Sequence, residues 1–196
     1  MPHRMFLISP ANCTGKRAGY LLRNDGQSPL AARLRDGGAT IGEVFSLVSG
    51  LYFRGKLTYA LAFADPPPGM PGVQVIVPGR GLWPHDTVID IKEFRKIARV
   101  RVDPEVRGYT RPLVRDATSL ANALHPDDTT VLLGSIATTK YLAPLAVLGP
   151  RLQYPEEFVG RGDMSRGALM LKCAAERREL TYTSATEKGE SRESVR

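Results

Sequence analysis

Long apolar segments are missing from this sequence of 196 residues. No run reaches the roughly 18 or more apolar residues that a membrane-spanning helix needs. The first ten residues, MPHRMFLISP, also lack the apolar region and the small-residue cleavage site of a secretory signal. We therefore expect a cytoplasmic protein that does not act at a membrane.

Cysteine is scarce, because only Cys13 and Cys173 occur. Neither has a partner at the Cys–His spacing of a zinc site, so we expect neither a disulfide framework nor structural zinc. The sequence also lacks a local cluster of His, Cys, Asp and Glu ligands. We predict no metal and no other cofactor, and we interpret the two cysteines as ordinary thiols.

Acidic residues are outnumbered, with 20 Asp and Glu against 27 Lys and Arg and a net charge of +7. The segment from Glu176 to the C-terminus carries five acids and five bases, so the excess lies in the preceding part of the chain. This excess favours a polyanionic partner such as DNA. No obligate protein partner is evident.

The pattern of apolar segments predicts a single α/β domain with a mostly parallel central sheet and helices on both faces. Strands are expected at 5–9, 73–78, 97–103, 129–134 and 151–155. For 97–103 the alternative is a helix that extends from the preceding EFRK. Helices are expected as a pair from Thr40 onward, broken at Ser49–Gly50, and at 111–124, 135–149 and 164–178. Loops are expected at 9–19 and 24–29. The domain is assigned to residues 1–183, and residues 184–196 are predicted to be a disordered polar tail.

Ligands of such sheets bind outside the carboxyl ends of the strands. This rule selects four loops, at 9–17, 78–86, 134–140 and 158–167. Their polar side chains are Asn12, Lys16, Arg17, Arg80, His85, Asp86, Ser135, Thr138, Lys140, Arg161, Asp163, Ser165 and Arg166. Each also has a purely structural interpretation as part of a turn or as a helix cap.

Asp163 is the only carboxylate in FVGRGDMSRG, where Arg161 and Arg166 flank it. Breaking an N-glycosidic bond builds positive charge on the sugar, which a carboxylate stabilises, unless it instead activates the attacking water. The two arginines would then hold the phosphates on either side of an extruded nucleotide. The alternative is that Asp163 only caps the helix that starts near Met164.

Three segments resemble the uracil-DNA glycosylase superfamily: MFLISPAN, TVLLGSIATTKYL and RLQYPEEFVGRGDMSRG. The first matches the strand that ends in a water-activating Asp or Asn, here Asn12. The second matches the Leu-Leu-Gly-x-x-Ala segment, and the third stands at the final DNA-contacting loop. That loop lacks the His-Pro-Ser signature, so the resemblance does not imply uracil specificity, and the catalytic candidates become Asp163 and Asn12. The chain also resembles a bacterial phage-defence branch that excises modified cytosines, among them glucosylated hydroxymethylcytosine.

The candidate site residues fall into three groups. The catalytic candidates are Asp163 and Asn12, with Asp86 as a further acid. Those expected to contact DNA are Lys16, Arg17, Arg54, Lys56, Arg80, Lys140, Arg161, Ser165 and Arg166. Those expected to form the base pocket are Tyr52, Phe53, Trp83, His85, Asp86 and Ser135, although packing in the core is the alternative for each aromatic residue.

The function expected from these features is a hydrolase, a DNA glycosylase that removes a modified or damaged base and leaves an abasic site, in phage defence or DNA repair. Two alternatives stay open. One is a DNA-binding stress protein without enzymatic activity, because MFLISPAN is similar to the start of a peroxide-stress DNA-binding family. The other is an N-ribosyl hydrolase or transferase that acts on free nucleosides or nucleotides. The target base does not follow from the sequence.

Overall fold

The centre of the protein is a six-stranded sheet, seen in a computed structural model that describes residues 2–23 and 28–185. Four parallel strands form its middle: β3 (Val73–Val77), β1 (Arg4–Ile8), β6 (Thr129–Leu133) and β7 (Leu152–Pro155). Antiparallel strands β4 (Gly81–Pro84) and β8 (Tyr182–Ser184) form the two edges, in the order β4-β3-β1-β6-β7-β8. The predicted α/β fold with a mostly parallel sheet is confirmed.

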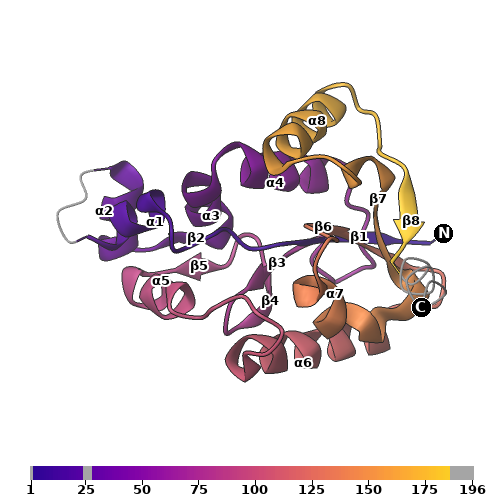
Figure 1. The fold of residues 1–196 in the computed structure, drawn as a ribbon, viewed down its shortest axis with the longest axis horizontal. Coiled ribbons are helices and arrows are strands. Elements are labelled where there is room, and N and C mark those ends of the chain that lie inside the picture. Colours follow the sequence, from indigo (N-terminus) through magenta and orange to yellow (C-terminus); the bar gives the residue numbers. More distant parts are fainter. Residues whose placement is uncertain (1, 24–27, 186–196) are drawn as a thin grey trace.

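Helices cover both faces of this sheet (Figure 1). One face carries α4 (Leu51–Phe63) and α8 (Asp163–Ala175). The other carries α6 (Arg107–Ala123) and α7 (Thr139–Leu145), which continues into the 3-10 helix η1 (Ala146–Arg151). A second 3-10 helix, η2 (Glu156–Phe158), precedes α8. Beyond the carboxyl end of β1 lie α1 (Lys16–Leu22), α2 (Pro29–Asp36), α3 (Ile41–Ser49), α5 (Ile91–Ala98) and the small sheet of β2 (Ala39–Thr40) and β5 (Val88–Ile89).

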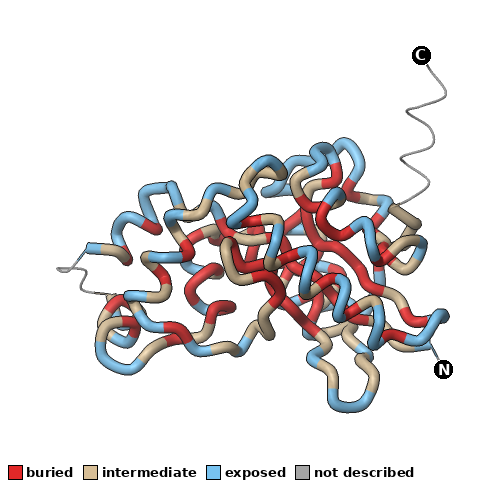
Figure 2. The backbone as a smooth tube through the Cα atoms, turned by 90° about the horizontal axis from the view of Figure 1, so that it is seen from below, coloured by how far each residue is buried: buried red, intermediate tan, exposed pale blue. Residues whose placement is uncertain are grey.

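Strand β1 divides the core into two layers. Phe6 and Ile8 belong to the apolar cluster that includes residues of α3, α4 and α8, whereas Met5 and Leu7 belong to the cluster with α6 and α7. All four side chains are fully buried. The strand therefore reads as an unbroken apolar run, as expected for a parallel strand covered on both faces. Figure 2 shows the buried segments running through the middle of the molecule.

Two glycines set the close contact between α4 and α8. A methyl group added to Gly55 would lie 2.6 Å from the carbonyl oxygen of Gly167, and one added to Gly167 would lie 2.9 Å from Cα of Tyr52. Asp163 is four residues before Gly167 and so lies on the same side of α8. The glycine contact thus holds the start of α8 near the start of α4.

One predicted strand is wrong. Residues 97–103 do not pair with the sheet, because Ile97 and Ala98 end α5 and the following residues are irregular. The alternation in IARVRVD has another cause: Ile97 is buried in one cluster, while Val100 and Val102 pack against the other. The apolar side chains cover the end of the sheet without extending it.

Several short elements were missed or misplaced. Helix α1 begins within the expected loop 9–19, and α2 begins at Pro29, the last residue of the expected loop 24–29; residues 24–27 of that loop lie outside the described residues. Strand β4 was not expected; Gly79 in the turn before it and Gly81 at its start have φ of 77° and 98°. The helix expected from 135 begins at Thr139. The predicted end of the domain at 183 falls within β8, and most of the predicted tail, from 186 on, lies outside the described residues.

Candidate active site

A cleft of about 450 Å³ opens at the carboxyl ends of β1, β3 and β6. The chain leaves β1 toward the face of α4, whereas it leaves β6 toward the face of α7 (Figure 1). The cleft thus lies where neighbouring parallel strands send their connections to opposite faces, which is the usual ligand site of such sheets. This depression is called the cleft below. The residues that line it are Ser9–Thr14, Ser49, Tyr52, Pro78, Ile97, Ala98, Val100–Val102, Ser135, Lys140, Tyr141 and Asp163.

Asp163 is the only carboxylate in that lining. It is the first residue of α8, and Gly162 rather than Asp163 is the N-cap residue. Its side chain is 66% exposed, and its Oδ1 lies 3.7 Å from Nη1 of Arg166. The positive end of the helix dipole and this guanidinium complement the negative charge of the carboxylate. Asp163 is therefore an accessible anion, and it does not serve as the cap that the alternative interpretation required.

Asn12 is held by a local turn. Its Oδ1 accepts hydrogen bonds from the backbone N–H of Thr14 at 3.0 Å and from Oγ1 of Thr14 at 2.7 Å. The amide oxygen is thus occupied, which leaves the N–H groups of the amide as donors for a ligand. Asn12 is suited to donate to a base or to water, and less suited to accept a proton from water.

Lys56 lies beneath the cleft, on α4, and is 1% exposed. Its Nζ is 2.8 Å from the carbonyl oxygen and 2.7 Å from Oγ of Ser9, and it lies 4.4 Å from the ring centre of Tyr52. Burial lowers the pKa of this amine to about 7, although the charge of Asp163 partly opposes the shift. The expectation that Lys56 contacts DNA phosphates is wrong, because its amine does not reach the surface.

Ser9 is positioned by the pairing of β1 with β6. Its backbone N–H donates to the carbonyl of Leu133 at 3.1 Å. A methyl group on the adjacent Gly134 would lie 2.9 Å from Cβ of Ser9, so glycine is needed to leave room for the serine side chain. Burial raises the pKa of Tyr141, and a hydrogen bond with Ser9 acts in the opposite direction. Ser9 therefore lies between the cleft and the buried amine of Lys56.

Sequence reasoning did not identify the contact between Ser9 and Lys56. The two residues are 47 positions apart and belong to different elements. One signal was present: Lys56 lies within LYFRGKLTYALAF, a helix that is otherwise mostly apolar. A lysine on the apolar side of such a helix needs a specific partner when buried.

Arg166 has a structural role that the sequence did not indicate. It is 7% exposed, and its Nε and Nη2 donate to the carbonyl oxygen of Phe158 at 3.1 and 2.8 Å. It also lies over the Phe158 ring. The expectation that Arg166 contacts DNA phosphates is wrong, since its side chain instead holds the turn before α8 against the core.

Burial raises the pKa of the cleft residue Tyr52, and the Arg166 guanidinium opposes this shift.

A second depression, called the basic groove below, lies beside the cleft and has a volume of about 1190 Å³. It is bordered by α1, α2, α3 and α4 and is lined by the exposed residues Lys16, Arg17 and Arg54. Arg33 also lines it, paired with Glu43 at 2.8 and 3.0 Å. The loop after β1 lines the cleft, and α1, which follows that loop, lines the groove. Three of the expected DNA contacts thus gather in one place.

Of the remaining candidate site residues, some line the cleft or the basic groove and others lie outside both. Ser135, Lys140 and Tyr52 line the cleft, and His85 lines the basic groove. Arg161 and Ser165 are exposed and bonded to each other at 3.3 Å. Arg80 is paired with Glu93, and Asp86 is exposed in the turn after β4; neither lines the cleft or the basic groove.

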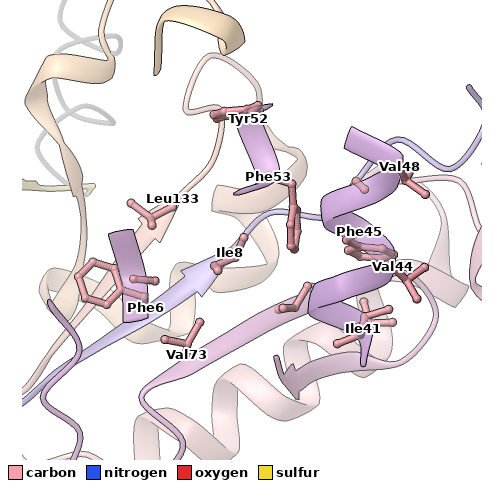
Figure 3. Packing of buried hydrophobic residues seen from close by; sticks show 14 of the residues in the cluster. Phe6, Ile8, Ile41, Val44, Phe45, Val48, Tyr52, Phe53, Val73 and Leu133 are labelled. Carbon is pink, nitrogen blue, oxygen red and sulfur yellow. The ribbon is translucent and has the colours of Figure 1, made fainter. Parts of the chain in front are cut away.

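Two aromatic candidates are not part of the cleft. Phe53 is fully buried and lies between Ile8 and Phe45 (Figure 3). Its expected role in stacking on a base is wrong, and packing in the core, the alternative, is what the structure shows. Trp83 packs against the same apolar cluster and lines a separate depression of about 440 Å³ with residues of β5 and α5.

In comparisons with protein-family models, curated proteins and solved structures, nothing matches this chain. Among the residues that the structure describes, no group of three or more His, Cys, Asp and Glu side chains is arranged to hold a metal ion. Within the same part of the chain, no helix combines the length and the apolar character that crossing a membrane requires. The cleft and the basic groove are therefore the features of the protein that bear on its function.

Proposed function

We propose that this protein is a DNA glycosylase that hydrolyses the N-glycosidic bond of a modified or damaged base in its cleft. The observation that carries the proposal is Asp163, the single carboxylate in the lining of a cleft that also includes Lys140 and Arg101, the second of which is paired with Asp103 outside the lining. The proposed cellular setting is the cytoplasm, in phage defence or DNA repair.

The charges of the cleft suit the two charges that develop when the bond breaks. The sugar becomes positive, and the Asp163 carboxylate stabilises that charge. The departing base becomes negative, and Lys140 and the free N–H groups of Asn12 stabilise it. The mechanism assigns no role to Arg166, which is bonded to the Phe158 carbonyl.

The sizes of the two depressions support a substrate that is DNA with one nucleotide extruded. A volume of about 450 Å³ suits a small-molecule ligand and not a duplex. An enzyme that acts on a base in duplex DNA takes it out of the helix first. The cations of the basic groove, Lys16, Arg17 and Arg54, would then bind phosphates next to the extruded nucleotide.

A second candidate function rests on the same cleft volume, which also suits a free nucleoside or nucleotide. An N-ribosyl hydrolase or transferase would use Asp163 in the same way and would not need the basic groove. Conversely, a DNA-binding protein without enzymatic activity would need only the groove. The three functions therefore differ in which depression is required.

The experiment is an incubation of the protein with plain DNA, uracil-containing DNA and DNA with glucosylated hydroxymethylcytosine, each single-stranded and duplex, followed by alkaline cleavage at abasic sites. Free nucleosides are tested in parallel for release of the base. Strand breaks that depend on one modified base support the glycosylase. Base release from nucleosides alone would support the second candidate, and DNA binding without any product would contradict both enzymes.

A further inference from the structure

The floor of the cleft contains a pair of residues that the glycosidic reaction does not use. Oγ of Ser9 and Nζ of Lys56 are 2.7 Å apart, and Ser9 lines the cleft while Lys56 lies behind it. A serine hydroxyl with a buried amine at hydrogen-bond distance has the arrangement of a nucleophile and its base.

The partners of Lys56 fit a neutral amine. Nζ donates to the carbonyl oxygen of Ser9 at 2.8 Å and to Oγ of Ser9 at 2.7 Å, and it lies 4.4 Å from the ring centre of Tyr52. When the amine is neutral, its lone pair can instead face Oγ of Ser9 and accept the hydroxyl proton. Burial without a bonded carboxylate disfavours the charged form and brings the pKa of Lys56 to about 7. The ionisable groups around the pair are Tyr52 on α4, Lys140 and Tyr141 on α7, and Asp163 and Arg166 on α8.

We propose that Ser9 and Lys56 form a nucleophile–base dyad, which gives the cleft an acyl-transfer activity toward an ester or amide that carries a negative charge. The serine is the nucleophile and the lysine takes its proton. Lys140 in the cleft lining would bind the anionic part of the substrate. This inference goes beyond the glycosidic reaction and does not depend on Asp163.

The proposed reaction needs no group other than the dyad, the substrate and water. Oγ of Ser9 forms a bond to the carbonyl carbon while its proton passes to Nζ of Lys56. The bond to the leaving group then breaks, and the Lys56 ammonium returns the proton to that group. Water attacks the acyl-Ser9 ester and passes a proton to Lys56, the acid departs, and Ser9 regains its proton from Lys56.

A purely structural lysine would explain the burial but not two other features. A structural amine would need the Ser9 oxygen as an acceptor for one of its N–H groups, but it would not need that hydroxyl to line the cleft as well. Nor would it need Gly134, whose missing side chain leaves room for Ser9 at the cleft. Both features instead place a hydroxyl where a ligand and the amine meet.

The test uses an alkyl fluorophosphonate, which reacts with activated serines and requires no knowledge of the natural substrate. The intact protein is labelled, and peptide mapping by mass spectrometry locates the adduct. We expect one adduct, on Ser9, formed with loss of fluoride, and a labelling rate that rises with pH through about 7 as Lys56 becomes neutral. Lys56→Met should slow labelling by about 10²–10⁴-fold, the usual contribution of a general base.

The control is Ser119→Ala, which removes an exposed serine of α6 outside the cleft and should label at the wild-type rate. Ser9→Ala should not label. Absence of an adduct on the folded wild-type protein, an adduct elsewhere, or equal labelling of Lys56→Met would overturn the dyad. If Lys56→Met does not fold, the wild-type pH profile decides, because a rate without an inflection near 7 would equally contradict the proposal.

Discussion

Replacement of the buried lysine should change how the stability of the protein depends on pH. In the folded protein the pKa of Lys56 is about 7, whereas its ordinary value is 10.5. Between these values the unfolded chain holds a proton that the folded chain does not. Stability should therefore rise with pH through this window, because unfolding gains less from proton uptake as the pH approaches the ordinary pKa.

The magnitude follows from the two pKa values. A difference of about three and a half units corresponds to roughly 4 to 5 kcal/mol of free energy lost at or below pH 7. Between about pH 6.5 and 8.5, roughly 2 kcal/mol of this loss should be recovered. Lys56→Met has nearly the same shape and no charge, so this pH-dependent increment should vanish in the variant.

The assay is urea unfolding of both proteins at the two pH values, followed by a comparison of the free energies of unfolding. The difference between wild type and variant cancels contributions from other groups, including Cys13, whose pKa burial raises to about 12. An equal pH dependence in the two proteins would refute the buried neutral amine. A constant offset between them would only report the lost hydrogen bonds to Ser9.

Two further predictions concern packing and DNA binding. Gly55→Ala should lower the free energy of unfolding by about 1–3 kcal/mol, because the added methyl group would lie 2.6 Å from the carbonyl oxygen of Gly167. The control is Gly19→Ala, which has open space around the added methyl group and should not destabilise the protein. Denaturant titration measures the free energy of unfolding of both variants. Arg54→Ala should reduce the slope of log affinity for DNA against log salt by about one, while Arg107→Ala, outside the groove, should leave it unchanged in binding titrations.

The arrangement of the main strands was predictable because β1 and β6 are covered on both faces and read as unbroken apolar runs. The short edge strands β4 and β8 carry no such pattern, and their pairing depends on turns and long-range contacts. The segment 97–103 was predicted to be a strand, but it does not pair with the sheet. Its alternating apolar residues have the period of a strand, but they pack over the end of the sheet.

The candidate site was partly predictable for a topological reason. Asn12, Ser135 and Asp163 are far apart in the sequence, yet each follows a strand of the parallel sheet, and all three line the cleft. Burial could not be deduced in the same way. Lys56 and Arg166 looked like surface cations, and only the packing of α4 against α8 shows that both are enclosed.

The most direct measurement of the central claim is the rate of abasic-site formation by Asp163→Asn at saturating DNA. Asparagine keeps the size of the side chain and removes its charge, so we expect the rate to fall by about 10²–10⁴-fold while DNA affinity is retained. Asp127→Asn, an exposed position after α6, serves as the matched control and should keep the wild-type rate. A wild-type rate in Asp163→Asn would contradict the assignment of the cleft carboxylate to the glycosidic reaction.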